Sequence, residues 1–137
     1  MTIKKIAGRQ EVIAAIVSFT YADVTSGTYA PAVDLPAGAI VVGGHLRIDT
    51  IFNSATDDKF SIGDQVQGDS AVGTTYAAQS ADITAAGAIA IVPTGKKYTK
   101  PATVGVVWTG TGAAPSAGAG RLTVLYVVEG RSAFTQG

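Results

Sequence analysis

The sequence predicts an all-β protein, an antiparallel two-sheet sandwich whose simplest form is a jelly roll. Three observations carry this prediction. Apolar and polar residues alternate with a two-residue period, turn-forming residues recur at regular intervals, and no segment has a convincing helical period. A jelly roll is the commonest arrangement for eight short strands of this spacing, and an immunoglobulin-like sandwich is the alternative.

Eight segments qualify as strands, because each is rich in apolar alternation and is bounded by Gly, Pro, Asn, Asp or Ser. These residues favour turns, since Gly reaches positive φ, Pro restricts φ, and Asn or Asp can bond to its own backbone. The expected strands are 12–21, 27–34, 39–52, 58–64, 70–78, 88–98, 102–109 and 121–131.

The segment 39–52 has the clearest alternation. Neighbouring side chains of a strand point to opposite faces, so one set is expected in the core and the other on the surface. The core set is Ile40, Val42, Gly44, Leu46, Ile48, Thr50 and Phe52, and the exposed set is Val41, Gly43, His45, Arg47 and Asp49.

The last two strands differ in how many of their faces are apolar. The segment 102–109 places Val104, Val106 and Trp108 on one face. The segment 121–131 is apolar on both, with Leu122, Val124, Tyr126 and Val128 on one face and Leu125 and Val127 on the other. A strand that is apolar on both faces is central in its sheet or covered by a second surface.

The N-terminal segment is expected to be an arm, residues 1–11, ahead of a single β-sandwich domain, residues 12–137. A chain of 137 residues is long enough for one core. The apolar run Val12 to Val17 is too short to cross a membrane, and no cleavage pattern directly follows it. We therefore expect neither a secretory signal nor a membrane partner.

The composition narrows the classes of partner. The formal net charge is zero, which argues against direct binding of nucleic acid. Only 15% of the residues are charged, against about 25% in typical soluble domains. A neutral surface of small residues suits a protein covered by partners or by copies of itself, although a β domain can also tolerate neutrality on its own.

The search for catalytic and metal-binding residues is negative, so we expect no enzyme, no cofactor and no metal. The chain has no cysteine and one histidine, His45, whose neighbours Arg47 and Asp49 favour a surface ion pair over a catalytic role. The acidic residues between Asp57 and Asp69 lack the spacing of a calcium loop, which favours solvated turn acids. The loop 110–120 lacks the glycine and lysine spacing of phosphate-binding loops.

Five stretches together resemble small structural proteins of tailed bacteriophages, above all capsid decoration, or cement, proteins. These stretches are 19–27 (FTYADVTSG), 35–44 (LPAGAIVVGG), 49–54 (DTIFNS), 108–122 (WTGTGAAPSAGAGRL) and 126–131 (YVVEGR). The resemblance implies a jelly-roll-like, dimeric, non-enzymatic module on the outer surface of the virion capsid. It would bind the major capsid protein and stabilise contacts between its subunits.

Three regions are candidate contacts with the capsid or with a second copy. They are the arm, with Ile3, Lys4, Lys5 and Ile6, the loop 110–120, with Pro115, and the face of the last strand that bears Leu125 and Val127. Edge strands that pair across a two-fold axis would also satisfy unpaired backbone groups in a homodimer.

Two other classes of protein remain open. A head-tail joining or tail structural protein would have a similar β composition but would assemble into rings or tubes. A carbohydrate-binding module would use the same sandwich and exposed aromatic side chains, for which Tyr29, Tyr76 and Tyr98 are the candidates.

Overall fold

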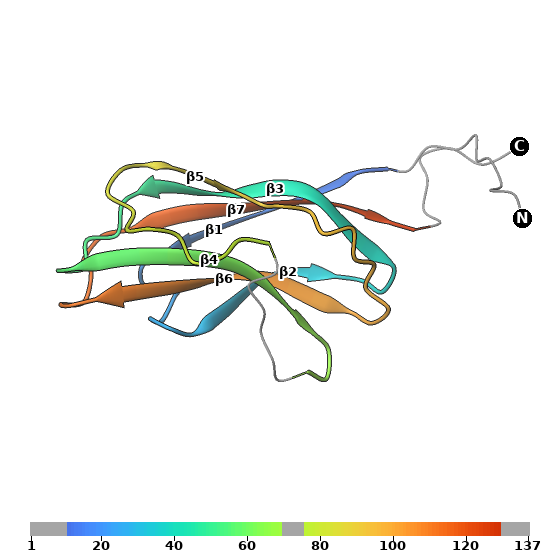
Figure 1. Ribbon diagram of the computed structural model, residues 1–137, viewed down its shortest axis with the longest axis horizontal. Coiled ribbons are helices and arrows are strands. Elements are labelled where there is room, and N and C mark those ends of the chain that lie inside the picture. Colours follow the sequence, from blue (N-terminus) through green and yellow to red (C-terminus); the bar gives the residue numbers. More distant parts are fainter. Residues whose placement is uncertain (1–10, 70–75, 130–137) are drawn as a thin grey trace, which may run out of the picture.

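The computed structural model describes residues 11–69 and 76–129, and within these ranges every regular element is a strand (Figure 1). The strands form two antiparallel sheets that lie face to face. The four-stranded sheet has the order β1-β7-β3-β5 and the three-stranded sheet the order β2-β6-β4. The strands are β1 (Ile13–Thr20), β2 (Tyr29–Leu35), β3 (Ala39–Thr50), β4 (Asp57–Val66), β5 (Gly87–Ala90), β6 (Ala102–Thr111) and β7 (Ala119–Val128).

The strand pairs are nested, which identifies the sandwich as a jelly roll. β1 pairs with β7, β2 with β6 and β3 with β5, so early strands pair with late ones in order. In the innermost pair, the described residues that follow β4 contribute a single bridge to it, Ile62 to Ala77. The predicted two-sheet sandwich is therefore confirmed, and its strand order is that of the jelly roll.

Two predicted strands are not seen in full among the described residues. Of the segment 70–78, residues 70–75 lie outside the described residues, and Ala77 forms only the bridge to β4. The segment 88–98 is a strand only as far as Ala90. The rest of it leaves β5 and crosses the side of the sandwich, where Tyr98 N–H donates to the carbonyl of Ala39.

The core contains the inward faces of both sheets. The predicted faces of β6 and β7 are confirmed, since Val104, Val106, Trp108, Leu122 and Val124 are all buried. At one end of the core, Phe52 packs its ring against three other aromatic rings. Its centroid lies 6.5 Å from that of Phe19, 5.1 Å from that of Phe60 and 5.3 Å from that of Trp108.

The alternation predicted for the segment 39–52 is wrong at its beginning because β3 contains a bulge. The register with β7 shifts between Val41 and Gly43, so Val41 is buried while Val42 is exposed. An extra residue in one strand exchanges the two faces beyond it. Gly44 permits the distortion, because its φ is +129° and a Cβ atom there would collide with the carbonyl oxygen of Thr123. After the bulge, Leu46 and Ile48 are buried as predicted.

The last strand, β7, is central, as its two apolar faces predict. It lies between β1 and β3, with Ala15 opposite Val124 on one side and Leu46 opposite Leu122 on the other. A central strand has both of its edges paired. The edge-to-edge pairing expected for a homodimer therefore cannot use β7.

Candidate interaction surfaces

The acidic segment of β4 provides buried hydrogen-bond acceptors, which corrects the prediction of solvated turn acids. Asp58 is 2% exposed and lies on the same side of β4 as Phe60. Its carboxylate accepts the indole N–H of Trp108 at 2.9 Å and the backbone N–H of Ser54 at 3.0 Å. Hydrogen bonds of this kind compensate part of the cost of burying a charge.

The second buried acid, Asp64, ends a chain of hydroxyl groups. Tyr98 donates to the Asp64 carboxylate at 2.6 Å, and the hydroxyl of Tyr76 lies 2.5 Å from that of Tyr98. Lys96 places its Nζ 3.7 Å from the same carboxylate and 5.0 Å from the centre of the Tyr98 ring. Burial raises the pKa of Tyr98 and of Tyr76 above the ordinary tyrosine value, because it disfavours the phenolate.

The burial of two of the three predicted glycan-contact tyrosines excludes most of the predicted carbohydrate-binding surface. Tyr76 and Tyr98 are each 1% exposed, so their rings cannot stack on a sugar. Tyr29 is half-buried and places its hydroxyl 2.9 Å from that of Thr103. Burial raises the pKa of Tyr29 to about 12. Tyr76 and Tyr98 pack in the core, so the carbohydrate-binding alternative loses two of its three candidate residues.

Metal and membrane features are absent from the parts of the chain that the structure describes. No group of three or more His, Cys, Asp or Glu side chains there is placed to hold a metal ion. Within residues 11–69 and 76–129, no helix is long and apolar enough to span a membrane.

The outer face of the four-stranded sheet is apolar in one half. Leu125 and Val127 point outward from β7 and are half-buried. The register places Leu125 between Ala14 of β1 and Gly43 of β3. We define the apolar half of this face by Ala14, Ile16, Ile40, Val42, Leu125 and Val127.

Two members of the apolar half were not among the predicted contacts. Ile16 is 63% exposed and Val42 is 42% exposed. Alternation with the inward residues Val17 and Phe19 already points Ile16 outward. Alternation does not predict the outward position of Val42, because the bulge interrupts it. The signal of the bulge in the sequence is the glycine pair after Val42.

The other half of the same face is polar. The Arg47 Nε lies 3.5 Å from Asp49 Oδ1, and the Arg121 Nε lies 3.1 Å from Asp49 Oδ2. His45 is exposed beside this network. The predicted surface ion pair of Arg47 and Asp49 is confirmed, and β7 adds Arg121 to it.

The loop between β6 and β7 is attached to the domain by Asn53. The Asn53 Oδ1 accepts the backbone N–H groups of Ser116 at 2.8 Å and Ala117 at 3.0 Å. Pro115 is half-buried and lines a hollow of about 420 Å³ together with Tyr21 and Val24. The loop thus presents Pro115 in one place at the end of the sandwich.

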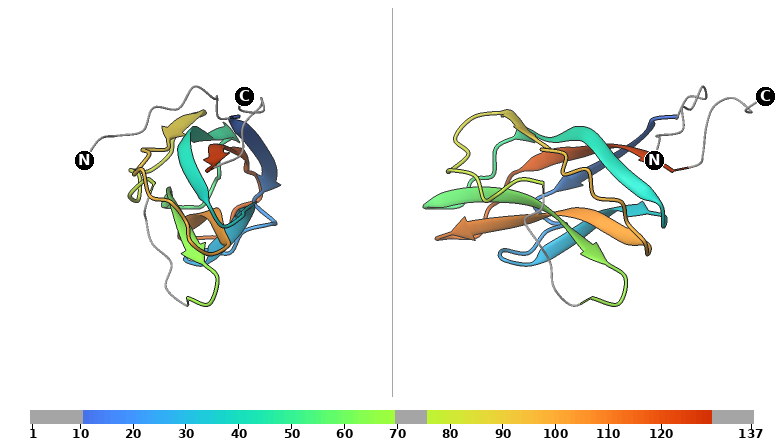
Figure 2. Two further views of the ribbon diagram at one scale, coloured as in Figure 1. Left: turned by 90° about the vertical axis from the view of Figure 1, so that its right-hand side faces the viewer. Right: turned by 45° about the vertical axis from the view of Figure 1, so that its right-hand side comes forward.

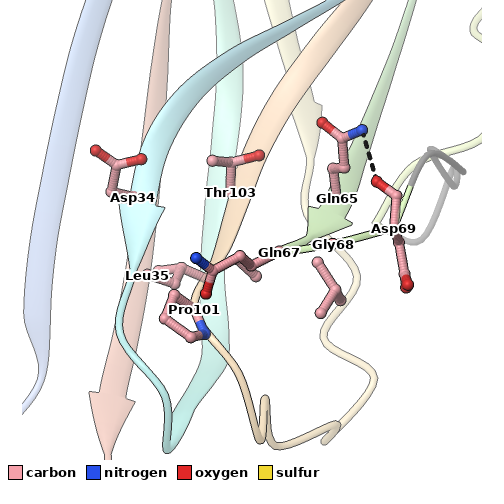
Figure 3. A pocket seen from close by; sticks show the side chains of 10 residues that line it. Asp34, Leu35, Gln65, Gln67, Gly68, Asp69, Pro101 and Thr103 are labelled. Carbon is pink, nitrogen blue, oxygen red and sulfur yellow. Dashed lines mark hydrogen bonds between the residues drawn. The ribbon is translucent and has the colours of Figure 1, made fainter.

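A second hollow of about 420 Å³ lies where β2, β4 and β6 meet (Figure 3). Asp34 and Asp69 come from opposite walls of it, and Gln65 donates from its side chain to the carbonyl of Asp69 at 3.1 Å. Thr103 and Pro101 lie between these walls. Among the described residues, its lining contains neither a nucleophile with its base nor a cation that could hold an anion.

The predicted arm contacts Ile3, Lys4, Lys5 and Ile6 lie outside the described residues. Of the predicted contact residues, the structure brings Leu125 and Val127 together on one face. It places Pro115 on the loop 112–118, outside the apolar half of that face.

No protein-family model matches the sequence, and no curated protein matches it. Solved structures do match. A chain of the cyanophage Pam1 capsid asymmetric unit superimposes with a TM-score of 0.64 at 21% identity, over 93% of this chain and 91% of that one. A chain of the capsid of Ralstonia phage GP4 gives a TM-score of 0.63 at 20% identity, over 96% and 92%.

A third match is a chain of the acid-stable capsid of Helicobacter pylori bacteriophage KHP30, with a TM-score of 0.56 at 16% identity, over 87% of this chain and 93% of that one. The agreement extends over nearly the whole length of all three chains. The protein therefore has the fold of chains found in the capsids of three bacteriophages.

Proposed function

We propose that the protein is a non-enzymatic structural protein of a tailed-phage virion, which binds the outside of an icosahedral capsid and stabilises contacts between major capsid protein subunits. The observation that carries this proposal is the near full-length likeness to chains in three phage capsids. The five sequence stretches that resemble capsid decoration proteins support the same role.

The mechanism is preferential binding to the assembled shell. A protein that binds the lattice but not the free subunits shifts the equilibrium toward the lattice, by an amount that grows with its concentration and affinity. No chemical step is needed, so the absence of a metal-binding cluster from the described residues is compatible with this role. Many identical weak contacts add up to a large effect on the shell.

The apolar half of the outer sheet face is the surface we assign to the homodimer. It combines three strands of one rigid sheet, and Ile16, Val42, Leu125 and Val127 lie on it. Contiguous exposed apolar surface is characteristic of protein interfaces. The polar half, with its ion pairs, would lie at the rim, where charged contacts contribute little to affinity.

The experiment is a binding assay with capsids purified without this protein. We expect saturable binding and an increase in the temperature at which the capsids release their DNA. Val127→Glu and Val42→Glu place a charge in the apolar half and should reduce dimerisation, measured by sedimentation. Ser18→Glu, on the same face but beside the ion pairs, is the matched control and should leave the dimer unchanged.

Deletion of residues 1–11 tests the arm. We expect loss of capsid binding while the far-ultraviolet circular dichroism spectrum remains that of the folded domain. Unchanged occupancy of the capsids by the truncated protein would contradict a role for Ile3, Lys4, Lys5 and Ile6.

The position in the virion separates this proposal from the joining or tail alternative. Electron cryomicroscopy should show density of this size over the junctions between capsid subunits. Density only at the neck or the tail, arranged in a ring, would overturn the proposal in favour of that alternative.

A further inference from the structure

Each sheet of the sandwich has two edge strands, and three of these four edges are protected against pairing. The outer edge of β4 is occupied by residues 76–83, whose backbone and side chains bond to it between Asp58 and Ile62. β2 carries Pro31 and a register shift directly after it. β5 is only 4 residues long. Prolines, bulges, shortness and coverage are the usual means of blocking an edge.

The fourth edge, β1, has none of these protections within the part of the chain that the structure describes. It is 8 residues long, and its sequence IAAIVSFT contains neither a charge nor a proline. Its register with β7 is continuous from Ile13 to Thr20, so it has no bulge. Long, uncharged and regular edges are templates for a further strand.

The backbone groups on the free edge can be identified from the turn after β1. Thr20 donates its N–H to the Asp23 carboxylate at 2.8 Å and accepts from Asp23 N–H at 3.0 Å, so both of its groups face away from β7. The N–H and C=O of one residue in an antiparallel strand point the same way, and the direction alternates along the strand. Ala14, Ile16 and Ser18 therefore present their N–H and C=O groups on the free edge.

A cleft of about 250 Å³ runs beside this edge, between β1 and β2. Figure 2 shows these two strands on one side of the sandwich and β4 and β5 on the other. The lining is mainly apolar, with Val17, Phe19, Ala30, Pro31 and Val106 among its residues. Its charged member, Asp23, is occupied by the turn.

We propose that the free edge of β1 binds an extended, uncharged segment of another protein, which adds to the sheet as an antiparallel or parallel strand. Alternate side chains of the segment would enter the cleft, so apolar residues are expected at every second position. This is strand addition, in which backbone hydrogen bonds supply affinity and the pockets for alternate side chains supply specificity.

A second copy of this chain fits the cleft less well than a separate segment. The inward side chains of a second β1 belong to its own core, since Phe19 is 8% exposed, and they cannot fill a neighbour's cleft. The ends of the chain lack the required alternation as well. Ile3 and Ile6 are three positions apart with lysines between them, and residues 130–137 contain a single large apolar residue, Phe134.

The test is selection from a display library of random peptides of about nine residues, the length of a typical long strand. The target is the purified full chain. We expect enrichment of uncharged sequences with apolar residues at every second position. In the free protein, the amides of Ala14, Ile16 and Ser18 should exchange rapidly with solvent, and an enriched peptide should slow all three.

Ser18→Pro removes one N–H group from the free edge without removing a hydrogen bond to β7. It should lower the affinity for an enriched peptide about tenfold or more. Ser18→Ala, which keeps the N–H, is the matched control and should change the affinity by less than about threefold. If the Ser18→Pro variant does not fold, the peptide can be changed instead. N-methylation of its alternate amides removes the N–H groups that would donate to the free edge of β1.

Three results would overturn the proposal: no enrichment above background, equal binding by the Ser18→Pro variant or the methylated peptide, or binding without protection of the three amides. Concentration-dependent protection of the Ser18 amide in the protein alone would also overturn it, because Ser18 lies outside the apolar half assigned to the homodimer and the occupant of its edge would then be a second copy. Capsids play no part in this experiment, so its outcome is independent of the proposed decoration role.

Discussion

The two long sides of the sandwich are completed in different ways. On the side of β4 and β5, residues 76–83 cover the edge of β4, and Tyr76 and Tyr98 join their hydroxyl groups to the buried Asp64. On the side of β1 and β2, a cleft remains, and no strand among the described residues pairs with the outer edge of β1.

This difference separates stability from recognition. The closed side contains large side chains without exposed surface, so its contacts contribute to the free energy of unfolding. On the open side, outward residues of β1 such as Ile16 have few such contacts to lose, which leaves them available for partners. Variants on the two sides should therefore differ strongly in their effects on unfolding.

The largest effect is expected for Tyr98→Ala on the closed side. The ring is 1% exposed and its loss leaves a cavity between the sheets. Truncation of a buried aromatic side chain typically costs about 3–5 kcal/mol. Urea unfolding followed by Trp108 fluorescence would measure the loss, and a change below about 1 kcal/mol would show that this side is not closed as described.

A smaller loss is expected for Tyr98→Phe, which keeps the ring and removes only the hydroxyl. Asp64 then loses one donor, and Tyr76 loses the group 2.5 Å from its own hydroxyl. Removing one partner of a buried polar group costs about 1–3 kcal/mol. The same urea titration should place this variant between the wild type and Tyr98→Ala, and equality with Tyr98→Ala would assign the whole effect to the hydrogen bonds.

The closed side should also make the protein sensitive to alkali. Burial raises the pKa of Tyr98 and Tyr76 above 10.0, so the folded protein keeps these protons longer than the unfolded chain. Their contribution to stability is complete below pH 10 and is lost as the pH rises above it. Unfolding free energies measured between pH 8 and about pH 11 should fall, and less steeply for Tyr98→Phe. A flat profile would contradict the burial of both hydroxyl groups.

The smallest effect is expected for Ile16→Thr on the open side, measured at a protein concentration low enough for the monomer, so that the proposed dimer does not contribute to stability. Ile16 is 63% exposed, and threonine is equally suited to a strand. Exposed substitutions of this kind change stability by less than about 0.5 kcal/mol. A loss comparable to that of Tyr98→Phe would mean that the outer face of β1 contributes to folding, and the contrast between the two sides would fail.

Alternation in the sequence was sufficient for the two-sheet sandwich and for most of its inward residues. A buried face must be apolar wherever it occurs along a strand, so alternation alone assigns Val104, Val106, Leu122 and Val124 to the core, where they are buried. The surface position of Arg47 and Asp49 follows from the same rule.

Alternation failed where a local pattern depends on distant contacts. The bulge at Val42 is accompanied by a close approach of Gly44 to the carbonyl of Thr123, which is remote in sequence. The burial of Asp58 and Asp64 depends on donors from Trp108 and Tyr98, which no local spacing in β4 reveals.

The sequence by itself therefore determined the fold class of the protein, a β-sandwich of low charge, and carried a resemblance to phage structural proteins. Only the tertiary structure decided which edges are covered, which carboxylates are buried, and where the apolar half of the outer face lies. Periodicity along the chain reports whether a residue faces inward or outward, whereas strand order and edge coverage arise from the packing of segments far apart in the sequence.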